Sequence, residues 1–153
     1  TPAGYHSVTP YLIVRDAAHA IDFYKRAFGA TEVLRLLYPD GKVAHAELAI
    51  GQGFVMLAEE MAEGDYRGPQ ALGGTPVSLL VYVPDVDAAF ARAVAAGATA
   101  QRPVADQFYG DRSGVLVDPF GHVWSLATHK EDVSAEEMSR RMQAMIASGA
   151  GAP

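Results

Sequence analysis

The chain has 153 residues, of which half are hydrophobic and a fifth are charged, as in a globular protein with one core or two tightly joined half-size modules. Its formal net charge of −6 argues against a nucleic-acid partner, because no basic stripe is present to neutralise phosphates. No membrane partner is expected either, since no run approaches the roughly 20 apolar residues of a membrane span and no secretory pattern opens the chain. The absence of cysteine excludes disulfides and thiolate chemistry and fits a cytoplasmic protein.

The first half of the chain predicts the order strand, helix, strand, strand, strand. The apolar run over 8–14 is typical of a strand, and Asp16 is a candidate N-cap for the helix that follows. Apolar residues then recur at helical spacing as far as Gly29, which stands where a C-cap glycine belongs. Three further strands are predicted, over 33–38, 42–50 and 54–59.

The second half repeats this pattern after a glycine- and proline-rich stretch over 61–76. We interpret that stretch as a surface connection, either a functional loop or a plain tether between modules. A strand over 78–83 and a helix capped by Asp85 then follow, and Val14-Arg15-Asp16 matches Val83-Pro84-Asp85 at an offset of 69. Two copies of one unit that each leave a sheet face uncovered should pack as a pair.

Residues 106–124, DQFYGDRSGVLVDPFGHVW, hold two β-rich runs joined by a tight turn at 118–121. Polar and aromatic residues before the first run are expected at the mouth of this hairpin, where they serve either a binding cleft or a polar network of the fold. Trp124 is expected in the core, and His129 in the loop after the last strand.

A helix is predicted to end the chain. Ser134 to Glu137 has the S-x-x-E form of a capping box. Four apolar residues follow at helical spacing, at 138, 142, 145 and 146. This stripe is expected to dock on the body of its own chain or to cover a dimer contact.

The order of these motifs resembles the vicinal oxygen chelate superfamily, which contains glyoxalases, bleomycin-resistance proteins and extradiol dioxygenases, and most of all its phosphonate-operon-associated glyoxalase-like branch. The resemblance rests on TPYLIVRDAAHAIDFYKRAFGA (9–30), HAELAIGQGFVML (45–57), FYGDRSGVLVDPFGHVWSLATH (108–129) and EDVSAEEMSRRM (131–142). It implies a single α+β domain over 1–153, in which two tandem βαβββ modules form a curved, cup-shaped mixed sheet with helices outside. The modules would span about 5–60 and 77–129, with a linker over 61–76 and a C-terminal helix over about 134–147.

The resemblance also indicates where a metal centre would lie. In metal-dependent members, His and Glu side chains from the first and last strands of each module hold a divalent ion, and these positions fall at Thr9, Met56, Ser78 and Ser125. Hydroxyls and a thioether are poor ligands for such ions, so we expect neither the usual metal centre nor another cofactor. The alternative is a displaced divalent site on His45 and Glu47, which share a strand face and could be joined by His6 or His122.

Alternation along the first strand of each module places aromatic and hydroxyl side chains on one face. Aromatic walls with a few polar groups suit a flat organic ligand, and Arg112 or the pair Gln107 and Tyr109 could fix its carbonyl or anionic group. The residues predicted to bind the ligand are Thr9, Tyr11, His45, Glu47, Met56, Ser78, Tyr82, Gln107, Tyr109, Arg112 and Ser125.

Three functions therefore stay open at this point. The first is binding of a small aromatic or hydrophobic molecule in the cup by a homodimer without the usual metal centre. The second is a lyase, isomerase or dioxygenase that depends on a displaced divalent metal. The third is a module that binds a protein partner. No catalytic residue stands out.

Overall fold

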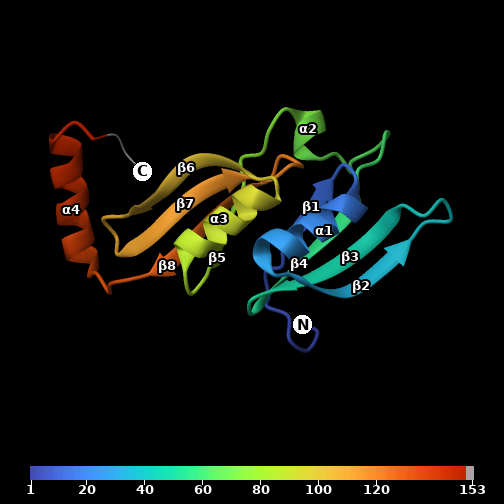
Figure 1. Cartoon of the computed structure of the whole chain (residues 1–153), viewed down its shortest axis with the longest axis horizontal. Helices are drawn as coiled ribbons and strands as arrows, with labels where there is room; N and C mark the ends of the chain where they lie inside the picture. The colour runs from blue at the N-terminus through green and yellow to red at the C-terminus, as the bar shows by residue number, and fades with distance from the viewer. Residues whose placement is uncertain (151–153) are drawn as a thin grey trace.

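Each half of the chain folds into its own four-stranded mixed sheet in the computed structural model, which describes residues 1–150 (Figure 1). The first half contains β1 (Tyr11–Val14), α1 (Ala17–Phe28), β2 (Thr31–Leu37), β3 (Val43–Ile50) and β4 (Gly53–Glu59). The second contains β5 (Ser78–Tyr82), α3 (Val86–Ala96), β6 (Thr99–Asp106), β7 (Asp111–Val117) and β8 (Val123–His129). The strand orders β1-β4-β3-β2 and β5-β8-β7-β6 are equivalent, so the predicted pair of βαβββ modules and the α+β class are confirmed.

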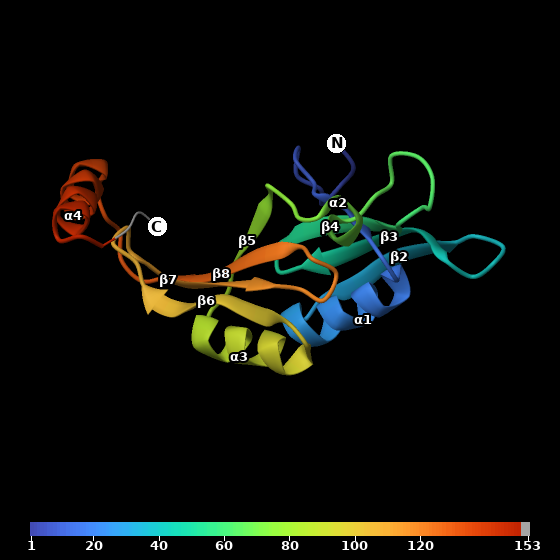
Figure 2. The ribbon, with the colours of Figure 1, turned by 90° about the horizontal axis from the view of Figure 1, so that it is seen from above.

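The two modules meet through their helices and turns. No strand ladder joins the sheets among residues 1–150, so the expected single curved sheet is instead two neighbouring sheets. In Figure 2, α1 and α3 lie side by side on one face of the strands, and the other face is free of long helices. Each sheet therefore has one face in the core and one open face, as expected for antiparallel-rich sheets.

The long helices begin and end where the sequence predicts. The Asp16 carboxylate accepts a hydrogen bond from the His19 N–H, and that of Asp85 accepts one from the Ala88 N–H. Gly29 follows α1 with a φ of 66°, a left-handed conformation that glycine adopts without strain. Buried residues at helical spacing then fix the face that α1 turns to the sheet.

The core between the modules is aromatic. Trp124 is fully buried, as predicted, and its ring centroid lies 5.4 Å from that of Tyr24 and 4.6 Å from that of Phe28. Asp118 is buried beside them and accepts hydrogen bonds from the Tyr24 hydroxyl at 2.7 Å and the Trp124 indole N–H at 2.9 Å. Aromatic rings of α1 thus pack directly on the last strand of the other module.

The structure corrects three local predictions. β1 begins at residue 11 rather than 8, because Pro10 has no N–H to donate to a ladder. His129 is the last residue of β8 and not a loop residue, because β8 continues until it pairs with Asp111. The polar and aromatic residues over 107–112 are confirmed at the mouth of the β7–β8 hairpin, which is the end of β7 opposite the turn at 118–121. The linker also contains a short helix, α2 (Pro69–Leu72), with proline at its first position.

The C-terminal helix α4 (Ala135–Ala147) forms as predicted, with the Ser134 hydroxyl accepting from the Glu137 N–H. The helix does not dock its apolar stripe on its own chain, because it buries no residue and lies at one end of the molecule (Figure 1). Polar contacts fix its base instead: Arg141 pairs with Glu131 and donates to the Phe108 carbonyl at 3.2 Å.

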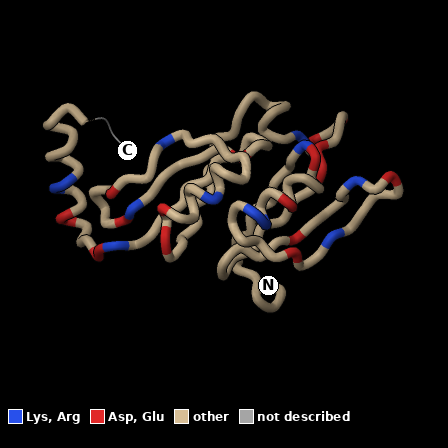
Figure 3. The backbone as a smooth tube through the Cα atoms, in the orientation of Figure 1, with Lys and Arg blue, Asp and Glu red and all other residues tan. Residues whose placement is uncertain are grey.

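Lys and Arg are interspersed with Asp and Glu along the backbone (Figure 3). Among residues 1–150, no helix has both the length and the apolar composition that a membrane crossing requires.

Candidate functional site

The open face of the first module presents Tyr11 above small and apolar neighbours. Strand alternation turns Leu12 and Val14 toward α1 and leaves Tyr11 and Ile13 on the open face, where the Tyr11 side chain is 45% exposed. Met56 pairs with both Tyr11 and Glu47 across β4, so these three side chains lie in one row across the sheet.

A chain of hydrogen bonds crosses this face. The Tyr11 hydroxyl lies 2.9 Å from Nδ1 of His45, and Nε2 of His45 lies 3.1 Å from a carboxylate oxygen of Glu47. The other oxygen of Glu47 accepts from the hydroxyl of Tyr5, whose ring stacks on Phe54 with centroids 4.2 Å apart. Four side chains from β1, β3 and the N-terminal segment thus form one connected polar group on a largely apolar sheet.

The chemistry of the side chains determines which of them donate and which accept the hydrogen bonds in this group. An ionised carboxylate only accepts, so His45 must carry its proton on Nε2, and in the neutral ring Nδ1 then accepts from Tyr11. Hydrogen bonds from Tyr5 and then His45 lower the pKa of Glu47, which keeps it ionised. Burial, and after it Tyr66, raises the pKa of Tyr11, so its hydroxyl keeps its proton.

The open face of the second module carries a different polar group. The Tyr82 hydroxyl donates to the buried carboxylate of Asp111 at 2.9 Å, and Nδ1 of His129 lies 2.8 Å from the other oxygen of Asp111. His129 also contacts Asp132 at 2.7 Å, so the two carboxylates, Asp111 first, raise the pKa of His129. Tyr82 itself is 61% exposed and available to a ligand.

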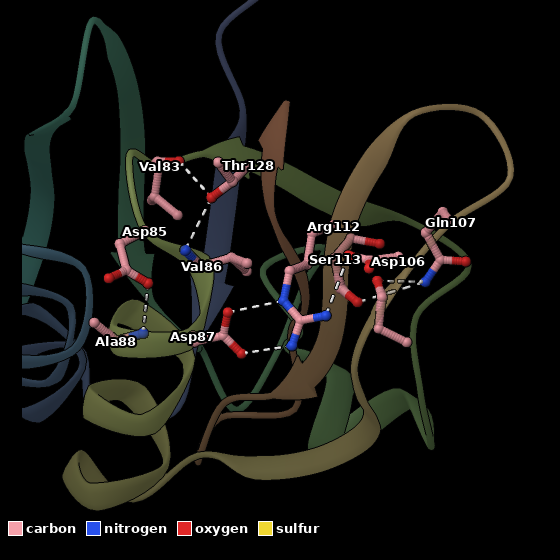
Figure 4. Close-up of polar contacts among 11 residues, drawn as sticks. Val83, Asp85, Val86, Asp87, Ala88, Asp106, Gln107, Arg112, Ser113 and Thr128 are labelled. Carbon is pink, nitrogen blue, oxygen red and sulfur yellow. Dashed lines mark hydrogen bonds and ion pairs between the residues drawn. The ribbon is translucent and has the colours of Figure 1, made fainter. Parts of the chain in front are cut away.

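Three predicted residues meet near the β6–β7 turn, but they do not all face the same way. The Tyr109 hydroxyl lies 3.4 Å from Ser113, and the Gln107 amide donates to the Ala105 carbonyl at 3.3 Å. Arg112 points to the helix side of β7 instead, where Figure 4 shows it between Asp87 and Asp106. Its guanidinium makes two 2.8 Å hydrogen bonds to Asp87 at the start of α3 and so braces the fold.

A cavity of about 670 Å³ lies between the modules. Its walls come from the N-terminal segment, the β3–β4 turn and β5, and they include Thr9, Phe54, Leu80 and Tyr82. This volume is within the range of small-molecule sites, and its lining is mostly apolar. Thr9 and Tyr82, predicted on separate modules, therefore share one hollow.

Sequence reasoning missed Tyr5, Asp111 and Tyr66 as members of the site. Tyr5 and Tyr66 come from irregular segments, and no periodic pattern could place them on the sheet. The position of Asp111 could have been predicted from the sequence. Counting outward along both strands from the tight turn at 118–121 pairs Asp111 with His129, as the structure shows.

Comparison with known proteins identifies the family. Residues 4–126 match the sequence profile of the Glyoxalase/Bleomycin resistance protein/Dioxygenase superfamily. The chain belongs to this superfamily. An uncharacterised protein of Mycobacterium bovis is 48% identical over 139 residues, which cover 89% of this chain and 91% of the relative.

Solved structures agree with the superfamily fold. The crystal structure of TioX from Micromonospora sp. ML1 is 32% identical, has a TM-score of 0.65 and covers 81% of this chain and 98% of its own. An Arabidopsis thaliana gene product is 28% identical, with a TM-score of 0.67 and coverages of 80% and 98%. The finer placement in the phosphonate-operon-associated branch stays a prediction.

The superfamily's metal positions do not fit a divalent ion in this chain. Thr9, Met56, Ser78 and Ser125 offer three hydroxyls and a thioether, which are weak donors for hard or borderline cations. The alternative pair, His45 and Glu47, is also a poor site for a divalent ion, because the two side chains already form hydrogen bonds with Tyr11 and Tyr5. Among residues 1–150, no group of three or more His, Asp or Glu side chains is placed to hold a metal ion.

Proposed function

We propose that this chain binds a small aromatic or hydrophobic organic molecule on the open faces of its modules, without the divalent metal centre of metal-dependent superfamily members. The observation that carries the proposal is the Tyr11–His45–Glu47–Tyr5 group. This group places side chains that form directional hydrogen bonds in the middle of a sheet face whose other side chains, such as Met56 and Phe54, are apolar. Orientation by a few polar groups within apolar walls is the usual design of a small-molecule site.

The proposal predicts that the protein is stabilised by an aromatic ligand after removal of metals. At a ligand concentration about 100-fold above Kd, native-state binding adds roughly 2.7 kcal/mol to the free energy of unfolding, which raises Tm by several degrees. The test is a thermal-shift screen of chelator-treated, dialysed protein against aromatic compounds that include antibiotics. The absence of any shift across such a library would overturn the proposal.

A pair of variants ties a positive result to the site. Tyr11→Ala should abolish the shift, whereas Val94→Ala should keep it, because Val94 is a similarly exposed side chain on the outer surface of α3, away from the open sheet faces. Equal loss in both variants would mean that the compound binds elsewhere.

The metal-dependent alternative is tested in the same preparation. It requires near-stoichiometric divalent metal in protein purified without chelators, and His45→Ala must remove that metal. We expect elemental analysis to find no such metal, since His45 and Glu47 lack a third protein donor among residues 1–150.

We further propose that the binding unit is a homodimer. Leu34 and Leu36 are exposed on the first module and Leu80 on the second, which leaves apolar surface open on both. A two-fold partner would let each module cover the other and enclose the ligand between them.

Sedimentation velocity tests this second proposal. Leu36→Lys with Leu80→Lys should shift the protein to monomer, whereas Val94→Lys on the outer surface of α3 should leave the dimer intact. A wild-type protein that sediments as a monomer at all concentrations would contradict it.

A further inference from the structure

The C-terminal helix α4 is fixed at its base but buries none of its residues. The Arg141 guanidinium donates to both carboxylate oxygens of Glu131, at 3.0 and 2.8 Å, and the Glu131 N–H donates to the Gly110 carbonyl. On the apolar stripe, Met142 is 38% exposed and Ile146 is 53% exposed. These contacts hold α4 in one place and leave its apolar stripe open.

A helix of this length needs a surface to pack on. A helix of 13 residues is only marginally stable in water by itself, because most helical stability in proteins comes from the packing of an apolar face. In α4 that face consists of three methionines and one isoleucine, at 138, 142, 145 and 146. Methionine adapts to irregular apolar surfaces, so the surface that covers this stripe is expected to be apolar too.

Strand β2 is an exposed apolar surface of this kind. It is the outer strand of the first sheet. Leu34 and Leu36 lie on the open face of that sheet and are 38% and 51% exposed, and Val33 and Leu37 are exposed as well. An outer strand with so many exposed apolar side chains is prone to aggregation unless another surface covers it.

The shape of the molecule shows how α4 and β2 can meet. They lie at opposite ends of the long axis, so α4 does not reach β2 of its own chain (Figure 1). Figure 2 shows α4 on the side of the sheets opposite α1 and α3, which is also the side that Leu34 and Leu36 face. A second copy, turned end for end over this side, brings both pairs of ends together at once, as a two-fold axis requires.

The charges at the two ends of the chain favour this pairing. Residues 25–45, which include β2, contain four Lys or Arg and two Asp or Glu. Residues 131–147, which include α4, contain two Arg and four Asp or Glu. Opposite charges therefore face each other when α4 meets β2, whereas like charges would meet if β2 paired with β2 or α4 with α4.

We propose that α4 is a dimerisation arm, which in a two-fold homodimer packs its apolar stripe on Leu34 and Leu36 of the partner subunit. The inference rests on the proposed homodimer and names the elements that form it. It also gives the exposed stripe of α4 and the exposed leucines of β2 one common explanation.

This arrangement completes the candidate ligand site. Leu34 lies opposite Glu47, and Leu36 lies opposite His45, on the neighbouring strand β3. A helix that covers these leucines stands beside the Tyr11–His45–Glu47–Tyr5 group, so α4 of the partner subunit forms one wall of the site. Each site is then complete only in the dimer.

Cross-linking tests the contact directly. The chain has no cysteine, so introduced thiols react selectively. Leu36→Cys with Ile146→Cys in one chain should give a covalent dimer with a short bismaleimide. Either substitution alone should give none, because equivalent positions lie at opposite ends of the proposed dimer. Leu36→Cys with Val94→Cys, on the outer surface of α3, is the control and should also give none.

A pair of charged variants tests the apolar stripe. Met142→Glu with Ile146→Glu places two carboxylates in the contact and should raise the Kd of the dimer about 100-fold or more. Gln143→Glu with Ala147→Glu adds the same charge to the opposite face of α4 and should change Kd less than about threefold. Sedimentation velocity over a dilution series measures both.

Each other outcome counts against a defined claim. The inference is overturned by a covalent dimer from Leu36→Cys alone, by a cross-link within one chain, or by no cross-link in the double-cysteine variant. A dimer that Met142→Glu with Ile146→Glu leaves intact assigns the stripe to a different partner and also overturns it. In these cases the proposed homodimer and ligand binding stand. A wild-type protein that is always monomeric overturns the inference and the homodimer together, and the thermal-shift screen judges ligand binding separately.

Discussion

At the scale of single residues, Asp118 connects the sequence motif DPFGHVW to the fold. Its carboxylate accepts from the backbone N–H groups of Phe120 and His122 at 2.9 and 3.0 Å, and from the side chains of Tyr24 and Trp124. One buried carboxylate thus closes the turn and fixes two large rings. The conspicuous motif near the end of the chain is therefore structural, and its Trp124 also lines the cavity between the modules.

Replacement of Asp118 by alanine should be strongly destabilising. The change leaves four donors, three of them buried, without an acceptor, and we expect a loss of about 3 kcal/mol or more in the free energy of unfolding. Urea denaturation measures this loss. Asp40→Ala, which removes a carboxylate from an exposed turn, is the control and should cost less than about 1 kcal/mol.

Residue types and spacing predicted part of the site and misplaced another part. Tyr11, His45 and Glu47 share a face because strand alternation is local, so the sequence was sufficient to group them. Arg112 was predicted at the ligand, but it is bound by Asp87 and Asp106 on the helix side. The alternation that turns Asp111 to the open face turns its neighbour Arg112 away, and only the register of β7 reveals which of the two faces the site.

At the scale of elements, the base of α4 is held by backbone packing on the β6–β7 turn. The N–H groups of Lys130 and Glu131 both donate to the Gly110 carbonyl, at 2.9 and 3.0 Å. A Cβ on Gly110 would overlap the carbonyl oxygen of Glu131 and touch Val133. The turn and the segment before α4 thus approach as closely as backbones can.

Gly110→Ala should therefore loosen this contact. We expect a loss of about 2 to 4 kcal/mol in the free energy of unfolding, or release of α4 alone, seen as faster proteolysis near residue 131. The matched control is Gly41→Ala, because Gly41 has a similar positive φ of 85° but no atom within 4 Å of a Cβ. The two variants share the backbone strain, so equal stability losses would contradict the packing argument.

The same junction should respond to pH through His129. A pKa raised in the folded state means that protonation of His129 stabilises the fold fully below its ordinary value of 6.5, and that this stabilisation is lost as pH rises through the raised value. His129→Gln should therefore lower Tm more at about pH 6 than at about pH 9. His19→Gln, at the exposed start of α1, is the control. A parallel shift of Tm at both pH values would contradict the assignment.

The C-terminal helix also shows what local patterns can predict. Ser134 and the apolar spacing of α4 were enough to place the helix, since capping and periodicity act within a few residues. The position of α4 was not predictable from such patterns. It depends on Arg141, which pairs with Glu131 and donates a hydrogen bond to the Phe108 carbonyl in the β6–β7 turn. Of the two surfaces predicted for its apolar stripe, the body of its own chain is therefore wrong, and the dimer contact stays a prediction.

At the scale of the whole molecule, a small set of contacts joins the modules. Tyr24 of α1 reaches Asp118, and the His122 ring lies 2.9 Å from the Ile13 carbonyl of β1. Arg92 of α3 donates to the Ala27 carbonyl at 3.1 Å where the two helices pack. The internal repeat predicted that the modules pair, but these contacts differ from one half to the other and no repeat could reveal them.

These contacts predict that the two modules unfold as one unit. Trp124 is the single tryptophan, it belongs to the second module, and its ring packs on Tyr24 and Phe28 of the first. Tryptophan fluorescence, which reports on this junction, and far-UV circular dichroism, which reports on both sheets, should therefore follow the same urea transition.

Tyr24→Phe removes the hydroxyl bound to Asp118 and should shift both curves together by about 1 to 2 kcal/mol. Tyr38→Phe, which removes an exposed hydroxyl, is the control and should move neither. If fluorescence changed at lower urea than circular dichroism, the junction would open before the sheets do, and the modules would be separate folding units joined by a weak interface.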